Sequence, residues 1–160
     1  MDLEKAIEIA IEAHRGQVDQ AGAKYIYHPL RVMSKMQDND RRIVAILHDV
    51  IEDTDVTIED LRIHGFNEEV LDSILVLTKL KWMNYFEYIQ NIIEYDKMHR
   101  KNRGINSIAL DVKLADLRDN MDFTRLHEIL RNDIKRNEKY AKARRMFYDY
   151  MIEGGIYIHG

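Results

Sequence analysis

The sequence predicts an all-α domain, and three observations support this. The chain has 160 residues with a single proline and seven glycines, so few residues interrupt helices. Several stretches repeat apolar residues at spacings of three and four, the period of an amphipathic helix. No stretch alternates apolar and polar residues for long enough to demand a strand. We therefore expect a compact multi-helix bundle that forms one domain over residues 1–160.

Composition narrows the class of protein. The chain is 46% apolar and 32% charged, as in ordinary globular proteins. It has no cysteine, which excludes thiolate metal sites and fits a reducing compartment. The N-terminus has no signal-peptide pattern, and no apolar run approaches the roughly 20 residues that span a bilayer. We therefore expect a cytoplasmic protein with no membrane partner.

The charge balance argues against a nucleic-acid partner. The net charge is −4, whereas a protein that binds nucleic acid through its phosphates is normally basic. Basic residues are concentrated only in the C-terminal quarter of the chain. The sequence is silent on the oligomeric state.

The first helices are expected to begin at recognisable caps. Asp2 can cap a helix that ends near Gly16, and a loop over 17–27 follows. His28 and Pro29 then open a second helix, because proline is favoured in the first turn and pushes the preceding residue to an extended conformation. This predicts that His28 lies at the helix cap, with its side chain free to point away from the helix axis.

A central helix, predicted from Asp40 to Glu52, carries ionisable groups inside an apolar run. The run I-V-A-I-L-H-D-V-I-E-D-T occupies residues 43–54. On one continuous helix, His48 and Glu52 would share a face, as would Asp49 and Asp53. An apolar run of this kind packs into the core, so the histidine and the acids need partners there.

The later helices are predicted from caps and periodicity. They are a short helix from a capping box at Thr57 to Gly65, a helix from Asn67 to Lys79, helices over 84–98 and 105–121, and a basic amphipathic helix over 133–151. The helix over 105–121 also places an acid, Asp116, among apolar residues. A basic loop is expected over 99–104, and a frayed or late-packing tail over 154–160.

Four of these residues are candidate ligands of a single metal ion: His28, His48, Asp49 and Asp116. A buried carboxylate is normally paired or bound to a metal. Two imidazoles and two carboxylates suit Mn²⁺, Fe²⁺, Co²⁺ or Zn²⁺. Taken alone, each residue has an ordinary explanation: His28 as a capping or surface histidine, and Asp116 as a buried partner of Lys113 or Arg118.

Five motifs together resemble a known family. They are A-H-R-G-Q (13–17), Y-I-Y-H-P-L (25–30), A-I-L-H-D-V-I-E-D-T (45–54), T-K-L (78–80) and V-K-L-A-D-L-R-D-N (112–120). In this order they resemble the HD-type hydrolase domain of the RelA/SpoT family, which small alarmone hydrolases carry alone. The resemblance covers about residues 3–130, which leaves the C-terminal helix over 133–151 and the tail outside it.

The resemblance implies a role for each motif residue. In such enzymes the H-P histidine, the H-D doublet and the L-A-D aspartate bind one Mn²⁺, which here implies His28, His48, Asp49 and Asp116. Glu52 and Asp53 resemble the acids that orient and deprotonate the attacking water. Asn120 resembles a residue that contacts the nucleoside. The implied reaction is metal-dependent removal of the 3′-pyrophosphate of (p)ppGpp, a small-molecule nucleotide.

Two departures from the family pattern leave the substrate open. Val18 and Asp19 stand where the family typically carries Arg-Lys, and Leu117 follows the L-A-D aspartate in place of arginine. A ppApp-type alarmone, the 2′-phosphate of NADPH and a nucleoside 5′-phosphate are the alternatives. The candidate phosphate-binding cations are Lys24, Lys79 and Arg118, with Arg31 and Lys113 as further ones. A nucleotide sensor without activity is disfavoured because every expected ligand and acid is present.

Overall fold

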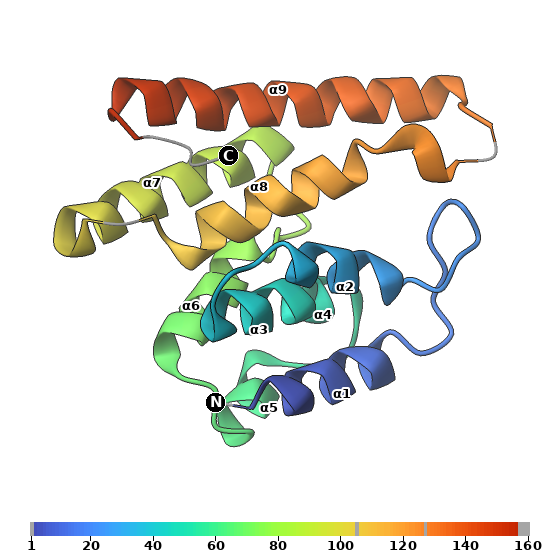
Figure 1. The fold of residues 1–160 in the computed structure, drawn as a ribbon, viewed down its shortest axis with the longest axis horizontal. Coiled ribbons are helices and arrows are strands. Elements are labelled where there is room, and N and C mark those ends of the chain that lie inside the picture. Colours follow the sequence, from blue (N-terminus) through green and yellow to red (C-terminus); the bar gives the residue numbers. More distant parts are fainter. Residues whose placement is uncertain (1, 105, 127, 157–160) are drawn as a thin grey trace.

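Helices joined by loops make up the described structure. This computed structural model describes residues 2–104, 106–126 and 128–156 (Figure 1). Within these ranges the only strand-like feature is an isolated bridge between Val18 and Lys24. The prediction of an all-α fold is confirmed.

The helices follow one another along the chain with short connections. They are α1 (Leu3–Ala13), α2 (Tyr27–Ser34), α3 (Asn39–Leu47), α4 (Val50–Asp53), α5 (Ile58–Ile63), α6 (Glu68–Leu77), α7 (Tyr85–Arg103), α8 (Ile108–Asn120), a 3₁₀ turn η1 (Phe123–Arg125) and α9 (Arg131–Glu153). Helix α9 lies along one side of the molecule, next to α7 and α8, and α1 and α5 lie at the opposite side (Figure 1). Helix α8 packs against α2, α3, α6, α7 and α9, so it joins the two sides.

Helix α3 forms the centre of the hydrophobic core. All five residues from Ile43 to Leu47 are fully buried, so the C-terminal half of this helix is covered on every side. It packs against α1, α2, α6 and α8. The chain directly after it, which begins with His48, is therefore held between α2 and α8.

The central helix is interrupted, which corrects the prediction of one helix from Asp40 to Glu52. Helix α3 ends at Leu47 and α4 begins at Val50, so His48 and Asp49 form the junction. The Ala45 carbonyl, in the last turn of α3, accepts a hydrogen bond from the His48 ring at 2.7 Å. A side chain that inserts into the backbone ladder in this way is a usual cause of a helix break.

Several helix boundaries also differ from the prediction. Helix α2 begins at Tyr27 after Ile26, so His28 lies inside the first turn and not at the cap. The prediction of a basic loop over 99–104 is wrong, because α7 continues to Arg103. The helix ends at Gly104, whose φ of 74° is in the left-handed region. Basic residues are favourable in the last turns of a helix, where they face the negative end of its dipole.

The last two helices agree with the prediction except at their ends. Helix α8 begins after Ser107, whose side chain caps it, and the predicted start at Ile105 lies outside the described residues. Helix α9 extends two residues beyond the predicted range of 133–151 at each end. Of the tail, the described part ends at Ile156, and residues 157–160 lie outside it.

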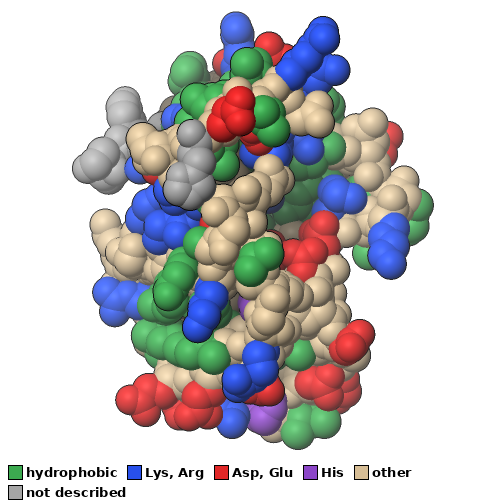
Figure 2. Space-filling model, turned by 90° about the vertical axis from the view of Figure 1, so that its right-hand side faces the viewer, with side chains coloured by type: hydrophobic (Ala, Val, Ile, Leu, Met, Phe, Trp, Pro, Cys, Tyr) green, Lys and Arg blue, Asp and Glu red, His purple; other side chains and the backbone are tan. Residues whose placement is uncertain are grey.

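Basic residues are frequent on α9, as the sequence suggested. On the face shown in Figure 2, acidic side chains lie mainly along the lower edge, and Lys and Arg are more frequent above it. Helix α9 itself carries more Lys and Arg than Asp and Glu, although the chain as a whole is acidic.

Replacement of Phe147 tests how α9 packs against the rest of the molecule. The Phe147 side chain is fully buried in the core. Replacement of Phe147 by alanine should lower the free energy of unfolding by about 3–5 kcal/mol, because it removes a buried ring and leaves a cavity. Urea unfolding followed by circular dichroism measures this. Ile152→Ala is the matched control on the same helix, because Ile152 is 75% exposed and should change stability by no more than about 0.5 kcal/mol. A loss below about 1 kcal/mol for Phe147→Ala would contradict the packing of α9 described above.

Candidate active site

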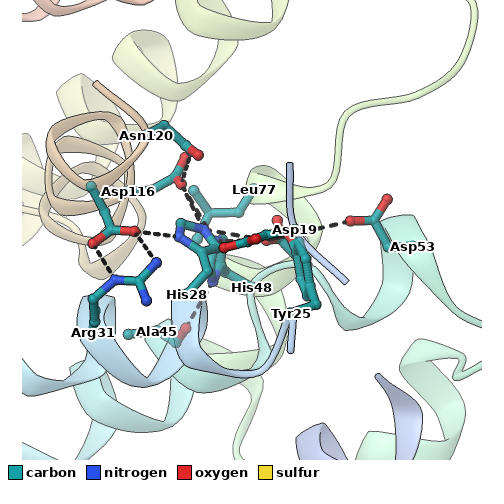
Figure 3. A network of polar contacts seen from close by, with 12 residues as sticks. Asp19, Tyr25, His28, Arg31, Ala45, His48, Asp53, Leu77, Asp116 and Asn120 are labelled. Carbon is teal, nitrogen blue, oxygen red and sulfur yellow. Dashed lines mark hydrogen bonds and ion pairs between the residues drawn. The ribbon is translucent and has the colours of Figure 1, made fainter. Parts of the chain in front are cut away.

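The four predicted ligands converge at one point from three parts of the chain. His28 comes from α2, His48 and Asp49 from the α3–α4 junction, and Asp116 from α8. The Nε2 atom of His28 lies 3.1 Å from Asp116 Oδ1 and 3.6 Å from Asp49 Oδ2. The Nε2 atom of His48 lies 3.1 Å from Asp49 Oδ2 and 3.7 Å from Asp116 Oδ1. Figure 3 shows His28, His48 and Asp116 pointing toward one another.

The spacing of these atoms suits a common metal ion. Ligand atoms bonded at about 2.1 Å to one ion lie about 3.0 Å apart in an octahedron and about 3.4 Å apart in a tetrahedron. The measured separations of 3.1–3.7 Å fall close to this range. His48 Nε2 is fully buried, and besides its ion-pair contacts with Asp49 and Asp116 it has no hydrogen-bond partner in the described ranges. A buried acceptor without a partner is costly, and a bound cation would satisfy it.

Hydrogen bonds to the other ring nitrogen orient both histidines. His28 Nδ1 lies 2.8 Å from Asp119 Oδ2, and His48 Nδ1 lies 2.7 Å from the Ala45 carbonyl. A carboxylate and a carbonyl can only accept, so each Nδ1 carries a proton and donates it. Each Nε2 therefore faces the cluster, where it can give its lone pair to a metal ion in place of a proton, which is the usual arrangement around histidines that bind a metal.

The electrostatics of the cluster favour a cation at its centre. Burial alone would lower the pKa of His48, but the Asp49 carboxylate, with Asp116, raises it to about 10. Burial likewise opposes protonation of His28, and Asp116 and Asp119 outweigh it, so the pKa of His28 is also raised. The two acids thus attract positive charge, which a proton or a divalent ion can supply.

Asp116 is held on both oxygens. Lys113 Nζ donates to Oδ2 at 2.8 Å, and Asn120 Nδ2 donates to Oδ1 at 2.5 Å. The pairing with Lys113 that the sequence also allowed therefore exists beside the histidine contacts. Asn120, which the resemblance assigned to the nucleoside, lies at the edge of the cluster and lines a pocket of about 130 Å³ together with Tyr25 and Tyr140.

Tyr25 is a site residue that the sequence reasoning missed. Its hydroxyl donates to Asp49 Oδ2 at 2.5 Å and lies 3.5 Å from Asp53 Oδ2 (Figure 3). Burial and then the charge of Asp49 raise the pKa of Tyr25, so the hydroxyl keeps its proton and stays a donor. The one available signal was its position three residues before His28 in the Y-I-Y-H-P-L motif.

Glu52 and Asp53 lie beside the cluster in a pocket of about 720 Å³, which Gln17 and Asp55 also line. Glu52 Oε2 accepts a hydrogen bond from the Lys79 backbone N–H at 2.8 Å. Both acids are open to solvent on one side. Partial burial nevertheless raises the pKa of each, and the charge of Asp49 adds to this. For Glu52 these two effects outweigh the hydrogen bond from the Lys79 N–H, which lowers its pKa. Carboxylates with raised pKa values are better proton acceptors near neutral pH.

The candidate cations are distributed unequally. The backbone N–H of Lys79 donates to Glu52, whereas the Lys79 side chain lies elsewhere, with Nζ 3.3 Å from the Leu80 carbonyl. Lys24 and Arg118 are both exposed. Arg118 is near Tyr148 of α9, and the pKa of Tyr148 is lowered by Arg144 and, to a smaller extent, by Arg118. No contact within the described part of the chain joins Lys24 or Arg118 to the ligand cluster.

Several known proteins with similar sequences carry the same name, and one of the similar proteins, from Streptomyces coelicolor, is named GTP pyrophosphokinase. No protein-family model matches the chain. A protein of Aquifex aeolicus named guanosine-3′,5′-bis(diphosphate) 3′-pyrophosphohydrolase is 36% identical over 125 residues, which are 75% of this chain and 17% of the relative. A protein of Vibrio cholerae with the same name is 41% identical over 86 residues, 50% of this chain and 12% of the relative. The chain thus spans less than a fifth of the length of these relatives.

A solved structure extends the similarity over most of the fold. It belongs to a metazoan ortholog of SpoT, described as hydrolysing ppGpp and acting in starvation responses. The match has a TM-score of 0.67 at 25% identity and covers 88% of this chain and 82% of that chain. The chain is a RelA/SpoT-type HD domain. Among the described residues of this HD domain, no helix is long and apolar enough to cross a membrane.

Proposed function

We propose that this HD domain is a Mn²⁺-dependent hydrolase that removes the 3′-pyrophosphate from (p)ppGpp-like nucleotides. The observation that carries the proposal is the cluster in which each of two Nε2 atoms lies 3.1–3.7 Å from each of two carboxylates, next to two acids with raised pKa values. The names of the relatives from Aquifex aeolicus and Vibrio cholerae, both guanosine-3′,5′-bis(diphosphate) 3′-pyrophosphohydrolases, support the substrate.

Each residue of the site has a proposed role that follows from its position. His28, His48, Asp49 and Asp116 would hold the ion, and Mn²⁺ is the proposed one among the first-row divalent metals. When bound, such an ion polarises a phosphoryl group and makes water more acidic. Glu52, fixed by the Lys79 N–H, takes the proton from the attacking water, and Asp53 helps to orient that water. Tyr25 donates to Asp49 and so fixes the carboxylate that lies between the two histidines.

A substrate panel tests the proposal. The purified protein with Mn²⁺ is given ppGpp, pppGpp, ppApp and NADPH, and the release of pyrophosphate and of phosphate is measured separately. We expect pyrophosphate from at least one of the three alarmones. Turnover of none of them would refute the proposed function.

One observation favours a substrate other than a guanine alarmone. Asp19, where the family typically has a cation, accepts hydrogen bonds from the Ala21 and Ala23 N–H groups at 2.9 and 3.0 Å and lies 3.7 Å from Arg125. Val18 beside it is 63% exposed. This loop therefore presents the apolar side chain of Val18, while the Asp19 carboxylate is only 15% exposed, so neither position offers a cation. A ppApp-type nucleotide or the NADPH 2′-phosphate is therefore the second candidate. Faster turnover of ppApp or NADPH than of ppGpp in the same panel would identify it.

The raised pKa of Glu52 sets a pH dependence. A proton acceptor works only when ionised, so kcat/KM should fall as pH is lowered through the raised pKa of this carboxylate. The acidic limb of the profile should therefore lie above the ordinary glutamate value of 4.5. Turnover is measured against pH at saturating Mn²⁺, with metal content checked at each pH. A profile that stays flat down to that ordinary value, with the metal retained, would contradict this role.

A further inference from the structure

Asp119 is a buried carboxylate next to the cluster of candidate ligands. The proposed chemistry does not use this residue. It lies on α8, one turn after Asp116, and is 3% exposed. Its Oδ2 lies 2.8 Å from His28 Nδ1. Arg31 grips the same carboxylate, with Nε 2.9 Å from Oδ1 and Nη2 3.0 Å from Oδ2. Lys35 Nζ at 3.8 Å and Arg125 Nη2 at 3.4 Å complete its surroundings.

The contacts form two matched pairs on facing helices. His28 and Arg31 are three residues apart on α2, and Asp116 and Asp119 are three residues apart on α8. Residues at this spacing lie on one face of a helix. The His28 ring therefore contacts Asp116 through Nε2 and Asp119 through Nδ1. Arg31 forms a bidentate pair with the Asp119 carboxylate.

This arrangement matters for metal binding because a histidine ligand must present a bare Nε2. A carboxylate that accepts from Nδ1 selects the tautomer with its proton on Nδ1, fixes the ring plane and makes Nε2 more basic. A bidentate arginine in turn prevents the carboxylate from rotating away.

We propose that Asp119 is a positioning residue that orients His28 for the metal, with Arg31 holding the Asp119 carboxylate in place. The inference rests on the proposed function, because it assumes that His28 binds a metal ion. It adds to the four ligands a residue that touches neither the metal nor the substrate, and it assigns Arg31 to Asp119 instead of to a phosphate.

Mn²⁺ affinity measured without substrate tests the proposal. The dissociation constant is obtained from the electron paramagnetic resonance signal of free Mn²⁺, titrated into metal-free protein. We expect Asp119→Ala to weaken binding by about 10–100-fold, the usual effect of losing such a partner. Asp119→Asn should weaken it less, because its amide oxygen can still accept from Nδ1. This milder variant decides the matter if Asp119→Ala does not fold, which circular dichroism shows.

The control separates positioning from general support of α8. Asp111 is on the same helix and is also paired with an arginine of another helix, since Arg41 Nε lies 2.7 Å from its Oδ2. Asp111→Asn should lower the melting temperature without changing Mn²⁺ affinity by more than about threefold.

Two results would overturn the inference. One is unchanged Mn²⁺ affinity in both Asp119 variants. The other is an equal loss in Asp111→Asn, which would reduce Asp119 to a structural support. A failure of the unmodified protein to bind Mn²⁺ is a separate outcome, because it removes the proposed metal site itself and the positioning role with it.

Discussion

Replacement of Asp49 by alanine should abolish Mn²⁺ binding and turnover while most of the helical signal survives. Asp49 Oδ2 lies 3.1 Å from His48 Nε2 and 3.6 Å from His28 Nε2, so one carboxylate serves both histidines. Its loss removes a proposed ligand and the charge that most favours a cation near His48. The Asp49 side chain does not cap α4, so the backbone does not depend on it.

The expected loss of turnover is large. Loss of the metal removes several kcal/mol of transition-state stabilisation, which corresponds to roughly 10³-fold or more in rate. Metal content, turnover and circular dichroism are measured on the same preparation. Asp72→Ala is the control, because Asp72 is an exposed acid of α6 outside the site and should change neither metal content nor rate. Retained metal stoichiometry in Asp49→Ala would refute the assignment of Asp49 as a ligand.

Replacement of Glu52 by glutamine should separate turnover from metal binding. Glutamine keeps the shape and still accepts from the Lys79 N–H, but it cannot take a proton. We expect turnover to fall by about 10²–10⁴-fold, the usual contribution of a general base. Mn²⁺ affinity should stay within about threefold, because Glu52 is not among the clustered ligands.

A surface glutamate provides the matched control for Glu52. Glu59 lies on α5 and pairs with Arg62, so Glu59→Gln removes a carboxylate of the same kind away from the cluster. Unchanged turnover in Glu52→Gln would remove Glu52 from the mechanism. In that case Asp53→Asn, tested in parallel, would show whether the neighbouring acid is the proton acceptor.

The sequence anticipated the fold class and the meeting of the four candidate ligands for one physical reason. His48 and Asp116 stand in apolar runs that had to be buried, and buried polar groups need partners. The helix contexts of His28 and Asp116, together with the resemblance of the motifs to the RelA/SpoT family, then indicated which distant residues would supply them. The roles of these residues in catalysis and metal binding are proposals, for which the experiments above are designed.

Other features depended on contacts between helices and could not be read from local patterns. The break at His48 and Asp49 follows from a hydrogen bond to the Ala45 carbonyl, whereas the apolar run around it continues through both helices. Tyr25 lies in a loop and donates a hydrogen bond to Asp49, and Asp119 on α8 accepts a hydrogen bond from His28 on α2. Apart from the position of Tyr25 in the Y-I-Y-H-P-L motif, nothing in the sequence near these two residues distinguishes them from an ordinary loop tyrosine and a helix aspartate.

The products formed from ppGpp test the central claim most directly. Metal-free protein is supplied with ppGpp before and after the addition of Mn²⁺, and GDP, pyrophosphate and phosphate are quantified together. We expect GDP and pyrophosphate in equal amounts, no phosphate, and turnover only after Mn²⁺ is added. Phosphate as the product, or equal turnover without a divalent ion, would contradict a metal-dependent 3′-pyrophosphohydrolase.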